Sequence, residues 1–176
     1  STSGCPDWVG SASATIYSFG TVYSITVSGL RFEPDEETPQ GRYVNYTLTQ
    51  SPAATWHVSG TIPWNEEACT PSGEMTLRPA DGTTGDNRVD GSLTIDLEEK
   101  DYQGAISGYN PDAILNVTCS DHITREISWP GWTIMNIGLP EPKITSRGLL
   151  DGQFCLPSSC PSNSRWSWHF EPAPPE

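Results

Sequence analysis

The sequence predicts an all-β fold, an antiparallel barrel or sandwich of about nine to ten short strands that is stabilised by disulfides. Three observations predict it. The 176 residues include 16 glycines and 16 prolines, which disfavour helix interiors. Short runs alternate β-branched or aromatic residues with small polar ones and are bounded by turn signals. No stretch sustains the helical period, and at most one helical turn is expected, at 65–68.

The extended segments can be placed in order along the chain. In 11–30 the alternation is interrupted by Gly20, which predicts two strands or one bent strand. The run 92–98 is the cleanest half-buried strand, because Leu93 and Ile95 alternate with polar residues. The segment 101–111 is expected to be a turn or a short strand. The other expected strands lie at 42–50, 55–63, 75–77, 115–119, 127–129, 132–137, 149–156 and 165–170.

The length is typical of a single domain. We expect an N-terminal arm at 1–10, one β domain at 11–170, and an extended proline-rich tail at 171–176. The chain begins at Ser1 without an apolar leader, which we interpret as a mature or trimmed form. It contains no run of about 18 apolar residues, so no membrane-inserted helix is predicted.

The charge narrows the classes of partner. The formal net charge is −13, and the chain has nine lysines and arginines in total. Phosphate backbones and anionic membrane surfaces are bound by clustered basic residues, so neither nucleic acid nor an anionic membrane is an expected partner. The acidity supports solubility.

The five cysteines are expected to form disulfides, because none lies in a C-x-x-C pair and the three histidines have no zinc-ligand spacing. Cys155 and Cys160 flank the four residues Leu-Pro-Ser-Ser, and this pair is the first choice for a disulfide. Cys69–Cys119 is the second choice. Cys5 is then free or bonded to another chain. In the alternative, Cys5 pairs with Cys69 or with Cys119. Disulfides indicate an oxidising, extracellular location.

Two N-glycosylation sequons agree with secretion. They begin at Asn45 and Asn116, and Asn45 falls on the polar face of its expected strand. Both asparagines are therefore candidate glycosylation sites.

No catalytic residue is predicted. The sequence lacks G-x-S-x-G, a glycine-rich phosphate loop and H-E-x-x-H. The residues Ser120, Asp121 and His122 have the types of a catalytic triad, but consecutive residues cannot converge as nucleophile, base and orienting acid. A pair of carboxylates for glycoside hydrolysis would depend on spatial separation, which the sequence does not reveal.

No cofactor is expected apart from calcium at one loop. Asp81, Asp86 and Asp90 supply hard oxygen ligands of the kind that calcium prefers. The loop lacks the EF-hand spacing, so a hydrated hairpin loop is the favoured interpretation.

The seven tryptophans divide into two groups. Four lie on strand faces and are expected in the core, namely Trp56, Trp129, Trp166 and Trp168. Trp8, Trp64 and Trp132 lie beside turn residues and are candidates for stacking on a ligand. His169 is expected to point away from the tryptophan face of its strand.

Three functions are compatible with these patterns, in this order. The first is a non-catalytic extracellular assembly subunit of a filament or cell surface, self-associating through sheet edges or terminal arms. The second is a secreted β-barrel module that binds a small apolar ligand or a carbohydrate. The third is a secreted glycan hydrolase.

Overall fold

The computed structural model describes residues 4–36, 41–52, 54–72, 74–77, 88–109, 113–128, 131–138, 140–156 and 164–174. The regular structure of these residues is entirely β, in two antiparallel sheets, which confirms the predicted fold class. The strands are β1 (Trp8–Ser18), β2 (Thr21–Pro34), β3 (Tyr43–Gln50), β4 (Ala54–Gly60), β5 (Ile62–Trp64), β6 (Glu67–Ser72), β7 (Glu74–Leu77), β8 (Arg88–Asp96), β9 (Asp101–Tyr109), β10 (Ile114–Cys119), β11 (Thr124–Ser128), β12 (Gly131–Asn136), β13 (Leu150–Leu156) and β14 (Ser164–Pro172).

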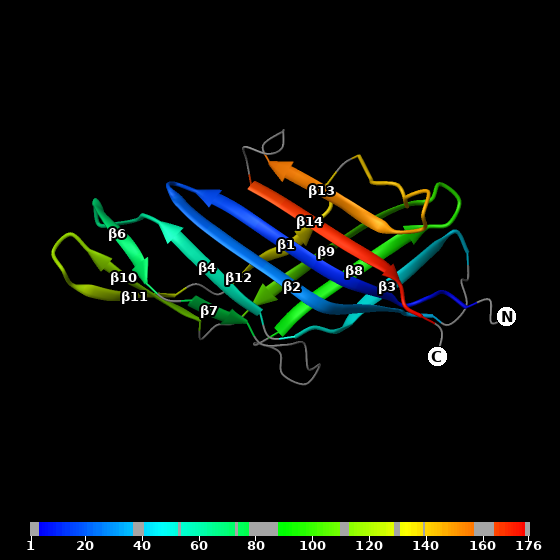
Figure 1. Ribbon diagram of the computed structural model, residues 1–176, viewed down its shortest axis with the longest axis horizontal. Coiled ribbons are helices and arrows are strands. Elements are labelled where there is room, and N and C mark those ends of the chain that lie inside the picture. The colour runs from blue at the N-terminus through cyan, green and yellow to red at the C-terminus, as the bar shows by residue number, and fades with distance from the viewer. Residues whose placement is uncertain are drawn as a thin grey trace.

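The larger sheet curls into a nearly closed barrel. Its strand order is β12-β9-β8-β3-β2-β1-β14-β13, and β4 pairs with β2 and continues to β7. The curl brings β12, at one edge, against β1 and β14 (Figure 1). The smaller sheet, in the order β11-β10-β6-β5, extends from one end of the barrel (Figure 1).

The long hairpin of β1 and β2 forms the centre of the larger sheet. The segment predicted as two strands or one bent strand is two strands, joined by Phe19 and Gly20, which both have positive φ. The register shifts between Gly10 and Ala12, opposite Gly29, whose φ is 72°. Such a bulge increases the local twist that a curled sheet requires.

Alternating aromatic and aliphatic side chains fill the barrel interior. Trp56, Phe32 and Phe170 are fully buried, and the Phe32 and Phe170 rings meet edge to face. The Trp168 indole N–H donates to the Tyr102 hydroxyl at 2.9 Å across this interior. Burial raises the pKa of Tyr102, so its hydroxyl keeps its proton. The packed interior leaves little support for an internal ligand site.

Three local expectations differ from the structure. Residues 65–68 contain no helical turn, because Asn65 and Glu66 have positive φ and form the turn between β5 and β6. The segment expected as a turn or short strand at 101–111 is the full strand β9. The segment 55–63 is divided between β4 and β5, and Pro63 lies inside the short β5.

The chain ends are part of the barrel. β1 begins at Trp8 and β14 ends at Pro172, and these two residues face each other in the sheet. Beyond them, the Ala173 N–H donates to the Asp7 carbonyl at 2.8 Å. Parts of both expected terminal segments, 1–10 and 171–176, are therefore sheet strands.

Replacing Tyr102 tests the hydrogen bond that crosses the barrel. In Tyr102→Phe the buried Trp168 N–H loses its acceptor with little change in volume. We expect the free energy of unfolding to fall by about 1–3 kcal/mol, measured by urea denaturation. Exposed Tyr17→Phe is the control and should change it by less than about 0.5 kcal/mol. Equal effects of the two variants would contradict this role for the bond.

Candidate functional site

The open edge of β13 is the first candidate surface. Every residue from Leu150 to Leu156 is paired with β14 in unbroken register, and no strand among the described residues pairs with the other side of β13. Proteins usually protect such edges with lysine, proline or a bulge. β13 has none of these, and Asp151 is its one charged residue.

β13 is left open because the barrel closes before reaching it. At the closing seam, the Trp166 indole N–H on β14 donates to the Thr133 carbonyl on β12 at 2.9 Å. Thr133 lies where the register of β12 against β9 shifts. β12 therefore packs beside β14, and β13 extends past the seam. Phe154 of β13 stacks on Trp166, which holds the overhanging strand in place.

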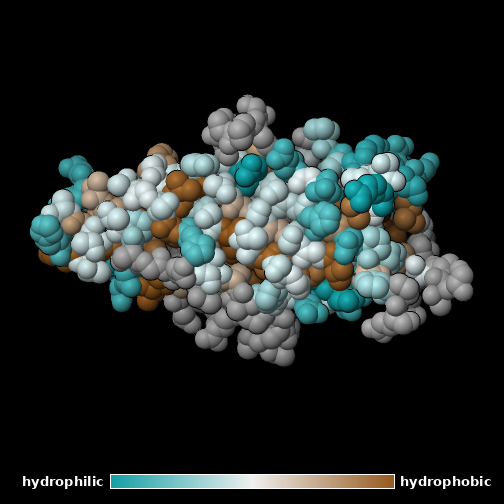
Figure 2. Space-filling view, viewed as in Figure 1, coloured by the Kyte–Doolittle hydropathy of each residue, from teal (hydrophilic) through white to brown (hydrophobic). Residues whose placement is uncertain are grey.

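A polar groove of about 550 Å³ lies on the outer face of β1, β14 and β13. The register places two cross-strand rows of outward side chains there. Small side chains form the floor, and the Ser13 and Ser167 hydroxyls hydrogen-bond at 2.7 Å. Figure 2 shows this face as a band of pale, weakly polar residues. The rows are Thr26, Ser13, Ser167 and Gln153, then Ser11, His169 and Asp151.

The second row has the residue types of a Ser–His–Asp triad without its geometry. His169 Nδ1 lies 3.7 Å from Asp151 Oδ2, and their side chains are 48% and 56% exposed. No hydrogen bond between Ser11 and His169 is found in the described part of the chain. Asp151 is the one carboxylate among the described residues that line the groove, whereas glycoside hydrolysis uses a pair of carboxylates.

An apolar pocket of about 260 Å³ opens at the end of the barrel where β1 begins. The N-terminal segment forms one wall and is fixed by an ion pair between Asp7 and Arg31. Burial raises the pKa of Tyr46 to about 12. The pocket is lined by Cys5, Trp8, Tyr46, Ile95, Leu97 and Ile144, among others.

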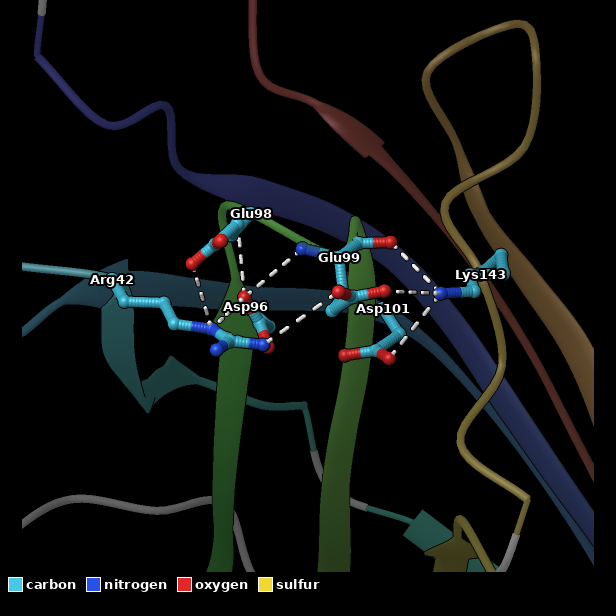
Figure 3. Close-up of polar contacts among 6 residues, drawn as sticks. All are labelled: Arg42, Asp96, Glu98, Glu99, Asp101 and Lys143. Carbon is cyan, nitrogen blue, oxygen red and sulfur yellow. Dashed lines mark hydrogen bonds and ion pairs between the residues drawn. The ribbon is translucent and has the colours of Figure 1, made fainter.

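A cluster of charged residues, shown in Figure 3, adjoins the pocket residues Ile95, Leu97 and Ile144 in the sequence. The Arg42 guanidinium donates to both oxygens of Asp96, at 2.9 and 2.7 Å. The same carboxylate accepts the N–H groups of Glu98 and Glu99 at 3.0 and 3.1 Å. Arg42 first, and then these backbone N–H groups, hold the pKa of Asp96 well below its usual range.

The cluster also ties the β8–β9 turn to the segment that follows β12. Lys143 Nζ donates to the Glu99 carbonyl at 2.9 Å, and the Ile144 N–H donates to the Lys100 carbonyl at 2.7 Å. Leu97 and Ile144 are thereby positioned as neighbours in the pocket wall.

The described cysteines are in two states. Cys69 and Cys119 form a disulfide between directly opposed positions of β6 and β10, as expected. Cys5 is a free thiol. Cys155 is disulfide-bonded, and its expected partner Cys160 lies outside the described residues.

The other predicted site residues do not form one site. The sequon residues Asn45 and Asn116 are exposed on β3 and β10. Asp90 is exposed on β8, whereas the other two calcium candidates, Asp81 and Asp86, lie outside the described residues.

The tryptophans follow the core prediction better than the surface prediction. Trp56, Trp166 and Trp168 are buried, as expected. Trp8 is only 5% exposed, so its expected place on the surface is wrong, because β1 begins at this residue and turns it into the core. Its expected role in stacking on a ligand stays a prediction. Trp64 is half-buried against the core. Trp129 and the side chain of Trp132 lie outside the described residues.

The comparisons with known proteins give no relative for this chain. No protein-family model matches it, and no curated protein or solved structure was found to be similar. Among the described residues, no helix has the length and apolar character needed to span a membrane.

The charged cluster predicts a specific dependence of stability on pH. The pKa of Asp96 is lower in the folded than in the unfolded protein, so its pairing stabilises the fold above the unfolded value of about 4. This contribution is lost as the pH falls below about 4 toward the folded pKa. Asp96→Asn should lower stability at pH 7 and flatten its decline below pH 4, measured by urea denaturation across pH. Parallel pH curves for the variant and the wild type would contradict the pairing.

Proposed function

We propose that this protein is a non-catalytic extracellular assembly subunit that associates through the open edge of β13. The observation that carries the proposal is the regular edge of β13 beyond the barrel seam, with which no strand in the described part of the chain pairs. A free strand edge presents unpaired backbone N–H and C=O groups to a strand of another chain. Packing of Phe154 on Trp166 keeps this edge extended and ready to pair.

The β13 sequence is compatible with a second copy of itself. In an antiparallel pair about a two-fold axis at Gln153, Leu150 faces Leu156 of the second copy and Gly152 faces its Phe154. Asp151 then faces Cys155, so the two carboxylates are not opposed. Apolar and aromatic cross-strand pairs stabilise antiparallel sheets, and directly opposed like charges destabilise them.

An extracellular location is supported by the Cys69–Cys119 disulfide, since such bonds persist in oxidising compartments. The exposure of Asn45 is compatible with glycosylation. A terminal-arm contact receives less support than the edge, because Trp8 and Pro172 already pair within the sheet.

The polar groove favours a second candidate function, binding of a carbohydrate. Asp151, Gln153 and His169 are planar polar groups on one side, and serine hydroxyls line the floor. Such groups donate to and accept from the hydroxyls of a sugar. The groove lacks an exposed aromatic platform among its described residues, so we rank this function second.

A charge placed at the proposed two-fold axis tests the assembly function. In Gln153→Lys two lysines would be directly opposed, and we expect the self-association constant to fall at least about tenfold. Sedimentation velocity over a range of protein concentrations measures it. The matched control is Gln103→Lys, which adds the same charge on β9, an inner strand of the same sheet.

The control should associate like the wild type. A wild-type protein that remains monomeric at millimolar concentration, or equal effects of the two lysines, would contradict assembly through the β13 edge.

A further inference from the structure

The tip of the β1–β2 hairpin exposes an aromatic ring in an unfavourable backbone conformation. Phe19 is 92% exposed, and its φ is 47°. Bulky residues rarely adopt this left-handed region, which glycine, asparagine or aspartate would occupy at lower cost. The exposed apolar ring and the strained backbone each cost free energy, and neither feature contributes to the packing of this molecule.

The hairpin tip is held rigidly by the next part of the sheet. The Thr61 N–H donates to the Gly20 carbonyl at 3.1 Å, and the Thr21 hydroxyl donates to the Thr61 carbonyl. Gly60 lies so close that an added Cβ would be 2.2 Å from the Gly20 carbonyl oxygen. A ring presented on so fixed a turn loses little conformational freedom on binding.

The apolar pocket lies at the other end of the same strand. Trp8 begins β1 and lines the pocket, whereas Phe19 follows its last residue. The 11 residues of β1 separate the two by roughly 35 Å. The pocket volume is about 260 Å³. An enclosed apolar cavity of about 150 Å³ holds a benzene ring, so the pocket has room for a phenylalanine side chain.

We propose that Phe19 of one copy inserts into the Cys5–Trp8 pocket of the next copy, which joins the molecules head to tail. The two surfaces differ and lie at opposite ends, so the contact is heterologous. Repetition of a heterologous contact that does not close a ring generates a filament. The inference rests on the proposed assembly function but uses a surface distinct from the β13 edge.

The hairpin tip carries no charge, which suits a second copy of this acidic chain as the occupant. Each copy has a formal net charge of −13, so most surfaces repel one another. The segments that form the tip, 17–22 and 58–62, contain no charged residue. Tyr17, two residues before Phe19, is 55% exposed and adds a further neutral surface. The tip can therefore approach an acidic neighbour without opposing like charges.

The test removes the ring and relieves the strained backbone. Phe19→Asn suits the left-handed conformation, so the variant should fold with unchanged or higher thermal stability. Combined with Gln153→Lys, which is expected to weaken pairing of the β13 edges, Phe19→Asn tests the head-to-tail contact by itself. We expect the remaining association constant to fall at least about tenfold, measured by sedimentation velocity. The matched control is Ile123→Asn, which removes another exposed apolar side chain.

A second readout follows the pocket itself. Cys5 is the free thiol of the described residues and lines the pocket. Its alkylation by iodoacetamide, followed by mass spectrometry, should slow at high concentration of the Gln153→Lys protein. The rate should not depend on concentration when Phe19→Asn is also present. A concentration-independent rate in both proteins, or equal weakening by Phe19→Asn and Ile123→Asn, would overturn the inference.

The two proposals fail in different ways. If Gln153→Lys weakens association and adding Phe19→Asn changes nothing further, the head-to-tail contact is wrong and the edge function stands. If Gln153→Lys has no effect and Phe19→Asn alone abolishes association, assembly through the edge is wrong and the head-to-tail contact stands.

Discussion

The architecture depends on two indole N–H groups of β14 that reach across the barrel. Trp166 donates to a backbone carbonyl of β12 at the seam, and Trp168 donates to the Tyr102 hydroxyl of β9 in the interior. An open sheet edge would otherwise leave that carbonyl without a partner in a partly buried setting, which is costly. β14 thus closes the barrel through side chains while its backbone pairs with β1 and β13.

Closure through side chains has a consequence for the surface. If β12 paired with β13 through its backbone, these two strands would not present open edges to solvent. Because β12 instead packs beside β14, β13 lies outside the seam, and no strand of the described residues pairs with its other side. The polar groove has the same origin, since its rows run from β1 across β14 to this overhanging strand. Both candidate surfaces therefore follow from where the seam falls.

The alternation of residues identified most strands, because side chains on a half-buried strand repeat with a period of two. It missed the extent of β9, where Gly104 and Gly108 blur the pattern. Trp8 was expected on the surface because it lies beside turn residues, but it is buried. The pairing of strands was beyond prediction, because local pattern does not specify partners. The β13 edge and the groove depend on that pairing. The hairpin tip is different, because the phenylalanine at position 19, directly before the hairpin glycine, is visible in the sequence itself.

The two proposed contacts have different symmetry and so different consequences for growth. Pairing of β13 with β13 is isologous and stops at two copies, whereas insertion of Phe19 into the next pocket continues without limit. A chain with both contacts would form paired filaments. Its charge of −13 per copy opposes this growth, and salt would weaken that opposition by screening. Association is then confined to surfaces with little charge, and the hairpin tip and β13 are two such surfaces.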